Sequence, residues 1–277
     1  MDEFFLSYDF MRRAVFAGLL SGIACGLSGV FVVLLRISFV GVCIAHASLA
    51  GALIAVFLGF SALPGAILFS LLAAGTIGPL AEKGAMSPDT ATGVIFSVML
   101  SASMLALGLL PGARADGLGL IWGSILTVSA IDIRLLAIVS FTVVAFIILF
   151  FKEIQATLCH RETALASGIP AKAIGQIMLL LLGMVVASGI KSVGGLLIYS
   201  LIVTPAAAAL QLTYRLGRMF LLSALFGVIS TWAGLWLSWL LDWPSGATIV
   251  LCATVILICS LVFSPKRRRQ NQRAGES

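Results

Sequence analysis

Long stretches without any charged side chain constrain this chain more than any other feature. The longest runs from Ile37 to Ala81, 45 residues without Asp, Glu, Lys or Arg. Only 10% of the 277 residues are charged, whereas a soluble domain needs roughly 25% to cover its surface. An uncharged apolar run of about 18 residues or more is long enough to cross the core of a bilayer. The sequence therefore predicts an all-α, polytopic helical membrane protein.

The uncharged runs also give the expected number of spans. Nine are long enough to cross, provided that Pro64-Gly65 divides the 45-residue run in two. The other seven are Ala14–Leu35, Thr90–Ala113, Leu135–Phe151, Ala173–Ile190, Ser192–Tyr214, Met219–Leu241 and Trp243–Pro265. A further run, Gly117–Ile131, has 15 residues and rises only about 22 Å as a helix. We expect it to form a short re-entrant or buried helix. The alternative is that it also crosses the membrane, which would give ten spans.

Lys and Arg in short loops predict the orientation. The chain ends on the strongly basic stretch PKRRRQNQR. We therefore expect one membrane domain, residues 1–265, followed by a basic cytoplasmic tail, residues 266–277. Loops 152–172 and 215–218 then also lie inside. The tail acts as a positive-inside anchor, and no nucleic-acid binding is expected.

The N-terminal half does not follow the rule as clearly. With nine spans, two basic residues of this half would lie inside, Arg36 and Lys83, and three would lie outside, Arg12, Arg13 and Arg114. With ten spans, the sides of these five residues would be reversed.

The first ten residues include three acidic ones and do not fit a secretory signal, so we expect the start of the chain to be retained.

Glycine and proline mark two of the spans. Gly18, Gly22 and Gly26 recur every four residues, which predicts close packing of the first span against a neighbour. In the span 192–210, Thr204-Pro205 lies near the middle, and proline removes a backbone hydrogen bond there. We expect this span to be kinked or broken and to border a pathway. A kink satisfied by neighbouring helices is the alternative.

A polar loop separates two of the spans. Within KEIQATLCHRETALASGIPAK (152–172) the segment RETALASG fits a short helix, with Glu162 in its first turn and Gly168 as its C-terminal stop. This helix, about residues 160–168, is too short and too polar to span. It can be a simple loop or a lever held by a soluble partner.

Several kinds of chemistry have no residues to support them. The chain contains no GxxxxGK[ST] phosphate loop and no HExxH metal motif. Its carboxylates lie at the ends of the uncharged runs and not well inside them, so neither an aspartyl pair nor a metal site with a carboxylate base is expected in the membrane. The sequence therefore does not indicate an enzyme or a self-powered pump.

His46 is the ionisable side chain placed deepest in a span. It lies ten residues after Arg36, about 15 Å along a helix and so near the bilayer midplane. Neutral imidazole binds divalent transition metals, and Cys43 shares its helix face. The alternative is a histidine hydrogen-bonded to a neighbouring helix, with a packing role only.

Four motifs in order resemble the integral-membrane permeases of bacterial ATP-binding-cassette importers for zinc, manganese and iron(II). FMRRAVFAGLLSGIACGLSGVFVVLLRISFVG (10–41) resembles the first span of that family. GVCIAHASLAG (41–51) is similar to its G-D-A-x-S-H-A-x-L-P-G. VGGLLIYSLIVTPAAAA (193–209) and LDWPSGATIVL (241–251) resemble its V-G-x-L-L-x-x-A-L-L-V-x-P-A-A-x-A and L-D-x-P-x-G-A-x-I-V. The resemblance runs nearly end to end.

The resemblance implies a homodimeric transport subunit in the bacterial inner membrane, with a cytoplasmic C-terminus. A separate cytoplasmic ATPase would bind the ATP, and a periplasmic or lipoprotein metal-binding protein would deliver the ion. The cargo would be a divalent zinc, manganese or iron ion, with no permanently bound cofactor. Import of a metal chelate or another small solute is the alternative. Glu162, Ala164 and Gly168 match the family's coupling helix, which docks on the ATPase.

The chain departs from the family pattern where the ion would pass. The family's carboxylate four residues before the histidine is Val42 here, its proline is Ala50, and the Asp of its coupling segment is His160. We expect His46, with Cys43, to form a softer passage site that suits zinc, copper(I) or a chelate better than manganese.

The last hairpin holds the remaining candidate site. Asp242, Ser245 and Gly246 lie at its outer end, where the binding protein would dock. The alternative is a turn set by Pro244 and Gly246, with Asp242 capping the following helix.

Overall fold

The computed structural model describes residues 9–84, 86–109, 125, 128–159, 161–190 and 193–264. The chain is all-α, and these residues form no strand. The helices are α2 (Asp9–Leu34), α3 (Val40–Phe57), α4 (Ala62–Lys83), α5 (Pro88–Leu109), α7 (Ala130–Leu149), α8 (Phe151–Cys159), α9 (Arg161–Ala166), α10 (Ala171–Ile190), α11 (Gly195–Leu212), α12 (Leu216–Leu241) and α13 (Ser245–Val262).

Each of the nine long apolar runs forms one long helix. Among the described residues, eight helices are long and apolar enough to cross a membrane, and α11 adds a shorter apolar stretch, Leu197–Leu212. The polytopic architecture is therefore confirmed. The expected short helix at 117–131 lies largely outside the described residues, as do His160 and the basic tail, residues 266–277.

The break in the 45-residue run lies earlier than predicted. The chain leaves the helix at residues 58–61, and Pro64 is the third residue of α4. A proline fits the first turn of a helix because its missing N–H would have no partner there. Gly59 ends α3 instead, with φ +81°. Its N–H donates to Val56 and that of Phe60 to Ala55, the pair of bonds typical of a left-handed helix end.

The glycine face of α2 packs against α12, as predicted. A β-carbon on Gly22 would lie 2.8 Å from the backbone of Gly227, and one on Gly26 would lie 2.6 Å from the carbonyl oxygen of Ser223. Ser223 Oγ donates to the carbonyl oxygen of Gly26 over 2.6 Å. Because Gly26 meets Ser223 while Gly22 meets Gly227, the two helices run antiparallel. Side chains at these glycines would force the helices apart.

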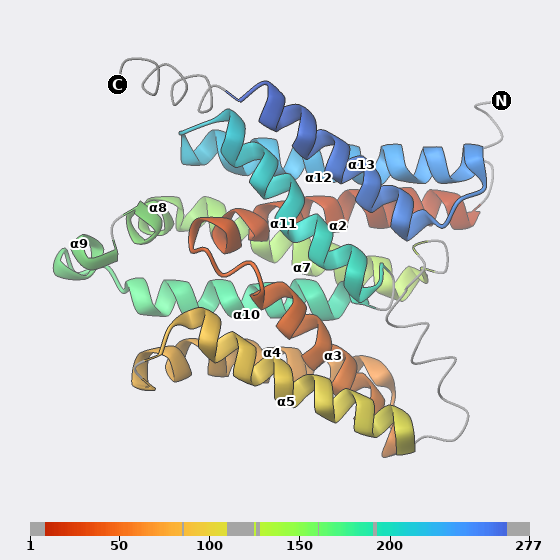
Figure 1. Ribbon diagram of the computed structural model, residues 1–277, viewed down its shortest axis with the longest axis horizontal. Helices are drawn as coiled ribbons and strands as arrows, with labels where there is room; N and C mark the ends of the chain where they lie inside the picture. The colour runs from red at the N-terminus through yellow and green to blue at the C-terminus, as the bar shows by residue number, and fades with distance from the viewer. Residues whose placement is uncertain are drawn as a thin grey trace.

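The two ends of the bundle carry different elements (Figure 1). At one end lie α8 and α9, and we call it the α9 end. Leu35 and Lys83 line a cavity there together with Arg161 and Lys172, so α2 and α4 finish at the α9 end. Helix α5 finishes and α7 begins at the opposite end. The end of α5 and the start of α7 therefore lie on the same side of the bundle.

Candidate functional site

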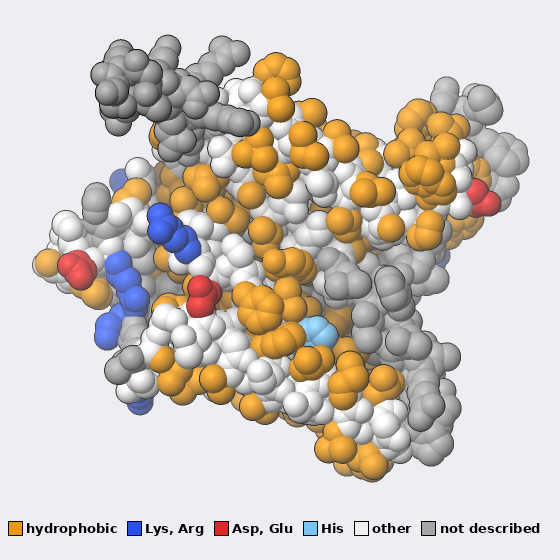
Figure 2. Space-filling view, viewed as in Figure 1, with side chains coloured by type: hydrophobic (Ala, Val, Ile, Leu, Met, Phe, Trp, Pro, Cys, Tyr) orange, Lys and Arg blue, Asp and Glu red, His pale blue; other side chains and the backbone are white. Residues whose placement is uncertain are grey.

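His46 lies in the first half of α3 and is half-buried. Its ring packs edge-on against Phe96 of α5, with centroids 5.1 Å apart, and Phe96 also contacts Phe39 at 4.9 Å. The buried Nδ1 atom has no hydrogen-bond partner within the described part of the chain. The structure therefore does not show the packing hydrogen bond that was the alternative to a ligand role. A histidine side chain is visible in Figure 2 between hydrophobic ones, away from the Lys and Arg side chains.

The neighbours of His46 on α3 differ in burial. Val42, one turn before it, is half-buried on the same face. Cys43 is fully buried, at 0% exposure, in the hydrophobic core. The described residues contain no group of three or more His, Cys, Asp and Glu that could hold a metal. This part of α3 thus presents one partly accessible imidazole beside a thiol that is enclosed by packing.

Helix α11 is continuous, which corrects the prediction of a broken span. It runs through Pro205, which is buried, and it packs against α2, α12 and α13. Thr204 is half-buried, and its hydroxyl lies 3.4 Å from that of Ser200, one turn earlier. The start of α11 meets α3, where a β-carbon on Gly41 would lie 3.2 Å from the Tyr199 ring. The helices of His46 and Thr204 are therefore neighbours.

Helix α9 forms at the predicted position and ends as predicted. Gly168 has φ +80°, its N–H donates to Leu165, and the Ile169 N–H donates to Ala164. Ala164 is 3% exposed and fixes the helix to the body, whereas Glu162 is exposed. Since α9 packs on both α8 and α10, a push on its outer face can reach the spanning helices.

The last hairpin lies at the end opposite α9. Asp242 is exposed and ends α12 with φ +56°, and Ser238 Oγ donates to the carbonyl oxygen of Trp243 over 2.6 Å. The residue before α13 is Pro244, and no side chain caps that helix. The alternative in which Asp242 caps α13 is therefore wrong. Of the other two candidates, Gly246 is half-buried and Ser245 is buried.

Comparison with known proteins gives the same architecture. Residues 7–264 match the ABC 3 transport family. The chain belongs to this family. A manganese transport system membrane protein, MntC of Halalkalibacterium halodurans, is 35% identical over 265 residues, covering 95% of this chain and 90% of the relative. The chelated iron transport system membrane protein YfeC of Yersinia pestis is 26% identical, covering 94% and 88%.

A solved structure agrees with this membership of the ABC 3 transport family. PsaBC from Streptococcus pneumoniae, solved in complex with Fab, matches with a TM-score of 0.86 and 29% identity, covering 99% of this chain and 100% of the other. The family resemblance inferred from the four motifs is therefore confirmed over residues 7–264.

The structure of this ABC 3 family member also contains features that its sequence did not indicate. Phe96, which packs on the His46 ring, lies 50 residues away in the chain. Phe31, Thr157 and Gln176 come together with Arg161 around one cavity. No local pattern marks these residues, because the helix packing alone brings them together.

Proposed function

We propose that this chain is the membrane-spanning subunit of an ATP-driven importer of a divalent transition metal ion. The observation that carries the proposal is the ABC 3 transport family match, which extends from residue 7 to residue 264. The manganese transport protein that is 35% identical supports a metal as cargo. The sequence has no GxxxxGK[ST] motif of its own, so a separate ATPase subunit supplies the energy.

The charge distribution supports an orientation with the α9 end in the cytoplasm. Seven of the described basic residues follow or precede helix ends on that side, and only three lie toward the other end. The seven are Arg36, Lys83, Lys152, Arg161, Lys172, Arg215 and Arg218, and the three are Arg12, Arg13 and Arg134. Cytoplasmic loops carry the excess of Lys and Arg, and Asp242 then faces the outside.

The proposed partners follow from this orientation. The ATPase docks on α9 through the face that carries Glu162, and its closure on ATP pushes α9 against α8 and α10. A metal-binding protein docks on the outer end near Asp242 and Gly246. Two copies of the chain form the transporter, with Thr204 and Pro205 of α11 beside the pathway.

His46 is the residue that we propose to contact the passing ion. A transported ion must bind strongly enough to enter and weakly enough to leave. One imidazole from each of two copies offers fewer ligands than the four of a closed structural zinc site, which favours release. Cys43 adds a soft ligand only if the packing around α3 opens.

The proposal is tested by ATP-dependent uptake in proteoliposomes that contain this chain, its ATPase and its binding protein. Zinc, manganese, iron(II) and copper(I) compete in the assay, for the wild type, for His46→Ala and for Val42→Ala as a control on the same face. We expect uptake to be lost in His46→Ala and kept in Val42→Ala. Equal uptake by the wild type and both variants would show that His46 has a packing role only.

Import of a metal chelate is the second candidate. The similarity to a chelated iron transport protein favours it, and so does the lack of a carboxylate at Val42. In the same proteoliposomes, uptake of a labelled iron chelate without uptake of any free ion would select this alternative.

A further inference from the structure

A row of three rings connects His46 with the turn before α3. Phe96 of α5 packs edge-on against the His46 ring, with centroids 5.1 Å apart. Phe39 packs edge-on against Phe96, with centroids 4.9 Å apart. Phe39 precedes His46 by seven residues, about 10 Å along a helix. Because α3 runs away from the α9 end (Figure 1), Phe39 lies nearer to that end than His46 does.

The two phenylalanine rings form an apolar barrier on that side of the histidine. Phe39 is 39% exposed and Phe96 is half-buried, so neither ring is enclosed in the core. Hydrophobic side chains separate the histidine from the Lys and Arg side chains of the α9 end (Figure 2). A phenyl ring offers no ligand to a metal ion, and a hydrophobic constriction excludes water and hydrated ions. An ion at His46 could not pass these rings unless they moved apart.

The turn that carries Phe39, residues 35–39, is strained. Arg36 has φ +58°, a conformation that is uncommon for a residue with a β-carbon. The N–H groups of Arg36 and Ile37 donate to carbonyl oxygens in the last turns of α2. Strained residues persist only where their surroundings hold them, and they cluster at segments that switch between conformations. The strain therefore marks this turn as a segment that can change conformation.

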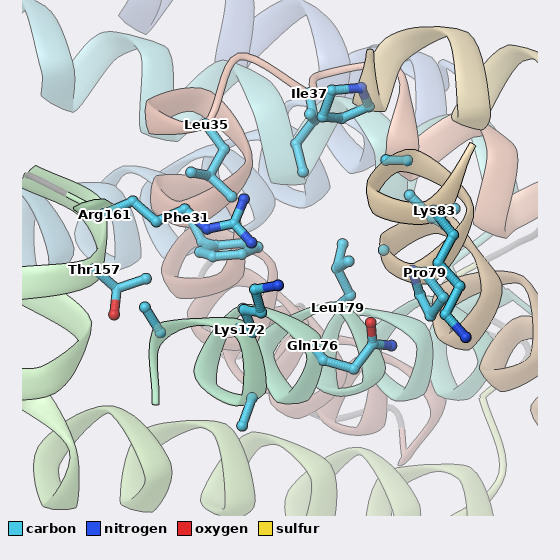
Figure 3. A pocket seen from close by; sticks show the side chains of 17 residues that line it. Phe31, Leu35, Ile37, Pro79, Lys83, Thr157, Arg161, Lys172, Gln176 and Leu179 are labelled. Carbon is cyan, nitrogen blue, oxygen red and sulfur yellow. The ribbon is translucent and has the colours of Figure 1, made fainter. Parts of the chain in front are cut away.

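A cavity of about 630 Å³ lies behind the same turn, at the α9 end. Leu35 and Ile37 point into it from the turn (Figure 3). Thr157 of α8 and Leu179 of α10 line its other walls. The turn therefore has room to move away from α5. Since α9 packs on both α8 and α10, a displacement of α9 changes the shape of this space.

We propose that Phe39 and Phe96 form the gate on the cytoplasmic side of His46, a role that rests on the proposed transport function. The gate is closed in this structure. It opens when the turn at residues 35–39 moves into the cavity and takes Phe39 off the Phe96 ring. A push on α9 reaches the gate through the walls of the cavity, so the two rings connect the ATPase contact with the ion.

The test measures access to position 46 from the cytoplasmic side. The full chain carries His46→Cys in a background without other cysteines, together with its ATPase, and a membrane-impermeant maleimide is added to inside-out vesicles. We expect Phe39→Ala and Phe96→Ala to raise the labelling rate about two- to tenfold, because one aromatic contact changes an equilibrium by about that factor. Phe96→Tyr keeps the ring and should keep the protection.

Two further variants act as controls. Phe146→Ala removes a ring contact of similar length, 5.0 Å to Phe150, at the end of α7, and should leave the labelling rate unchanged. Leu35→Trp fills part of the cavity and should lower the rate, since the turn then lacks room to move. The melting temperature of each variant shows how much its fold has been weakened.

Three results would overturn the proposal. Equal labelling of the His46→Cys parent, Phe39→Ala and Phe96→Ala would show that the rings do not close the pathway, even if both variants melt at a lower temperature. An equal rise in Phe146→Ala would show a general loosening of the bundle. A higher rate in Leu35→Trp would show that the turn does not move into the cavity. Labelling needs no transported ion, so a lack of metal uptake by the wild type would contradict the proposed function, whereas the labelling rates decide the gate.

Discussion

At the scale of the residue, His46 is placed at a cost in stability. A buried polar atom without a hydrogen bond costs about 1–3 kcal/mol, and Nδ1 of His46 is such an atom in the described structure. An alanine or leucine at this position of α3 would avoid that cost. Since a ligand that passes through supplies the missing partner for a short time, the unpaired nitrogen fits transport better than packing.

We predict that one substitution changes the metal preference of the proposed site at His46. Val42 lies one turn before His46 on the same half-buried face, so Val42→Asp would add a carboxylate oxygen beside the imidazole. Oxygen ligands favour manganese over softer ions. We expect the variant to shift competition in the uptake assay from zinc toward manganese. Unchanged selectivity would contradict the idea that Val42 sets the softness of the site.

Glycine packing gives a second prediction at this scale. A β-carbon on Gly29 of α2 would overlap the carbonyl oxygen of Ile202 in α11, whereas one on Gly93 of α5 would meet no atom within 4 Å. We expect Gly29→Ala to lower the free energy of unfolding by about 1–3 kcal/mol, since overpacking forces the helices apart. Gly93→Ala should leave it unchanged or raise it by up to about 1 kcal/mol.

Thermal unfolding of the purified protein in detergent measures both variants. Equal melting temperatures for Gly29→Ala and Gly93→Ala would show that α2 and α11 do not pack as closely as the structure has them.

At the scale of the element, Gly168 ends α9, the helix that we propose to dock on the ATPase. Gly168 has φ +80° with nothing within 4 Å of an added β-carbon, so alanine there meets backbone strain and no clash. The left-handed conformation costs an L-residue about 1–2 kcal/mol. The strain loosens the two hydrogen bonds that end α9.

We expect Gly168→Ala to reduce uptake while the ATPase still hydrolyses ATP at its basal rate. Gly217→Ala is the matched control, since this glycine of α12 lacks a positive φ and a β-carbon there would lie 3.5 Å from Phe151, an ordinary contact. Uptake and hydrolysis measured in the same proteoliposomes separate the two effects. If both variants behave alike, the turn at Gly168 has no part in coupling.

At the scale of the whole molecule, the antiparallel pairing of α2 and α12 places Arg12 and Asp242 at one end. Cys159 ends α8, which lies at the α9 end (Figure 1). With the α9 end in the cytoplasm, a membrane-impermeant maleimide should label exposed Cys159 in inside-out vesicles only. Asp242→Cys and Arg12→Cys should be labelled only in intact cells, in a background without other cysteines. Labelling of Arg12→Cys and Asp242→Cys from opposite sides would contradict the nine-span topology.

The amino-acid sequence alone was sufficient to predict the class of fold and the family. The length of an uncharged run indicates the length of a span, because a charged side chain in the hydrocarbon core is costly in free energy and is therefore rare within a span. Gly168 was predictable as a helix stop because the left-handed turn requires a residue without a β-carbon. The four motifs lie within continuous segments, so they could be compared with a family without any knowledge of packing.

The features that depend on contacts between helices could not be predicted from the sequence and became known from the packing of the helices. The 45-residue run breaks at Gly59 and not at Pro64 as predicted, and α11 is continuous through Pro205. The packing places Phe96 on the ring of His46 and brings Arg161 and Lys172 to one cavity. The physical reason is that nearly every position in these helices is apolar, so the sequence does not show which face of a helix meets a neighbour and which meets lipid.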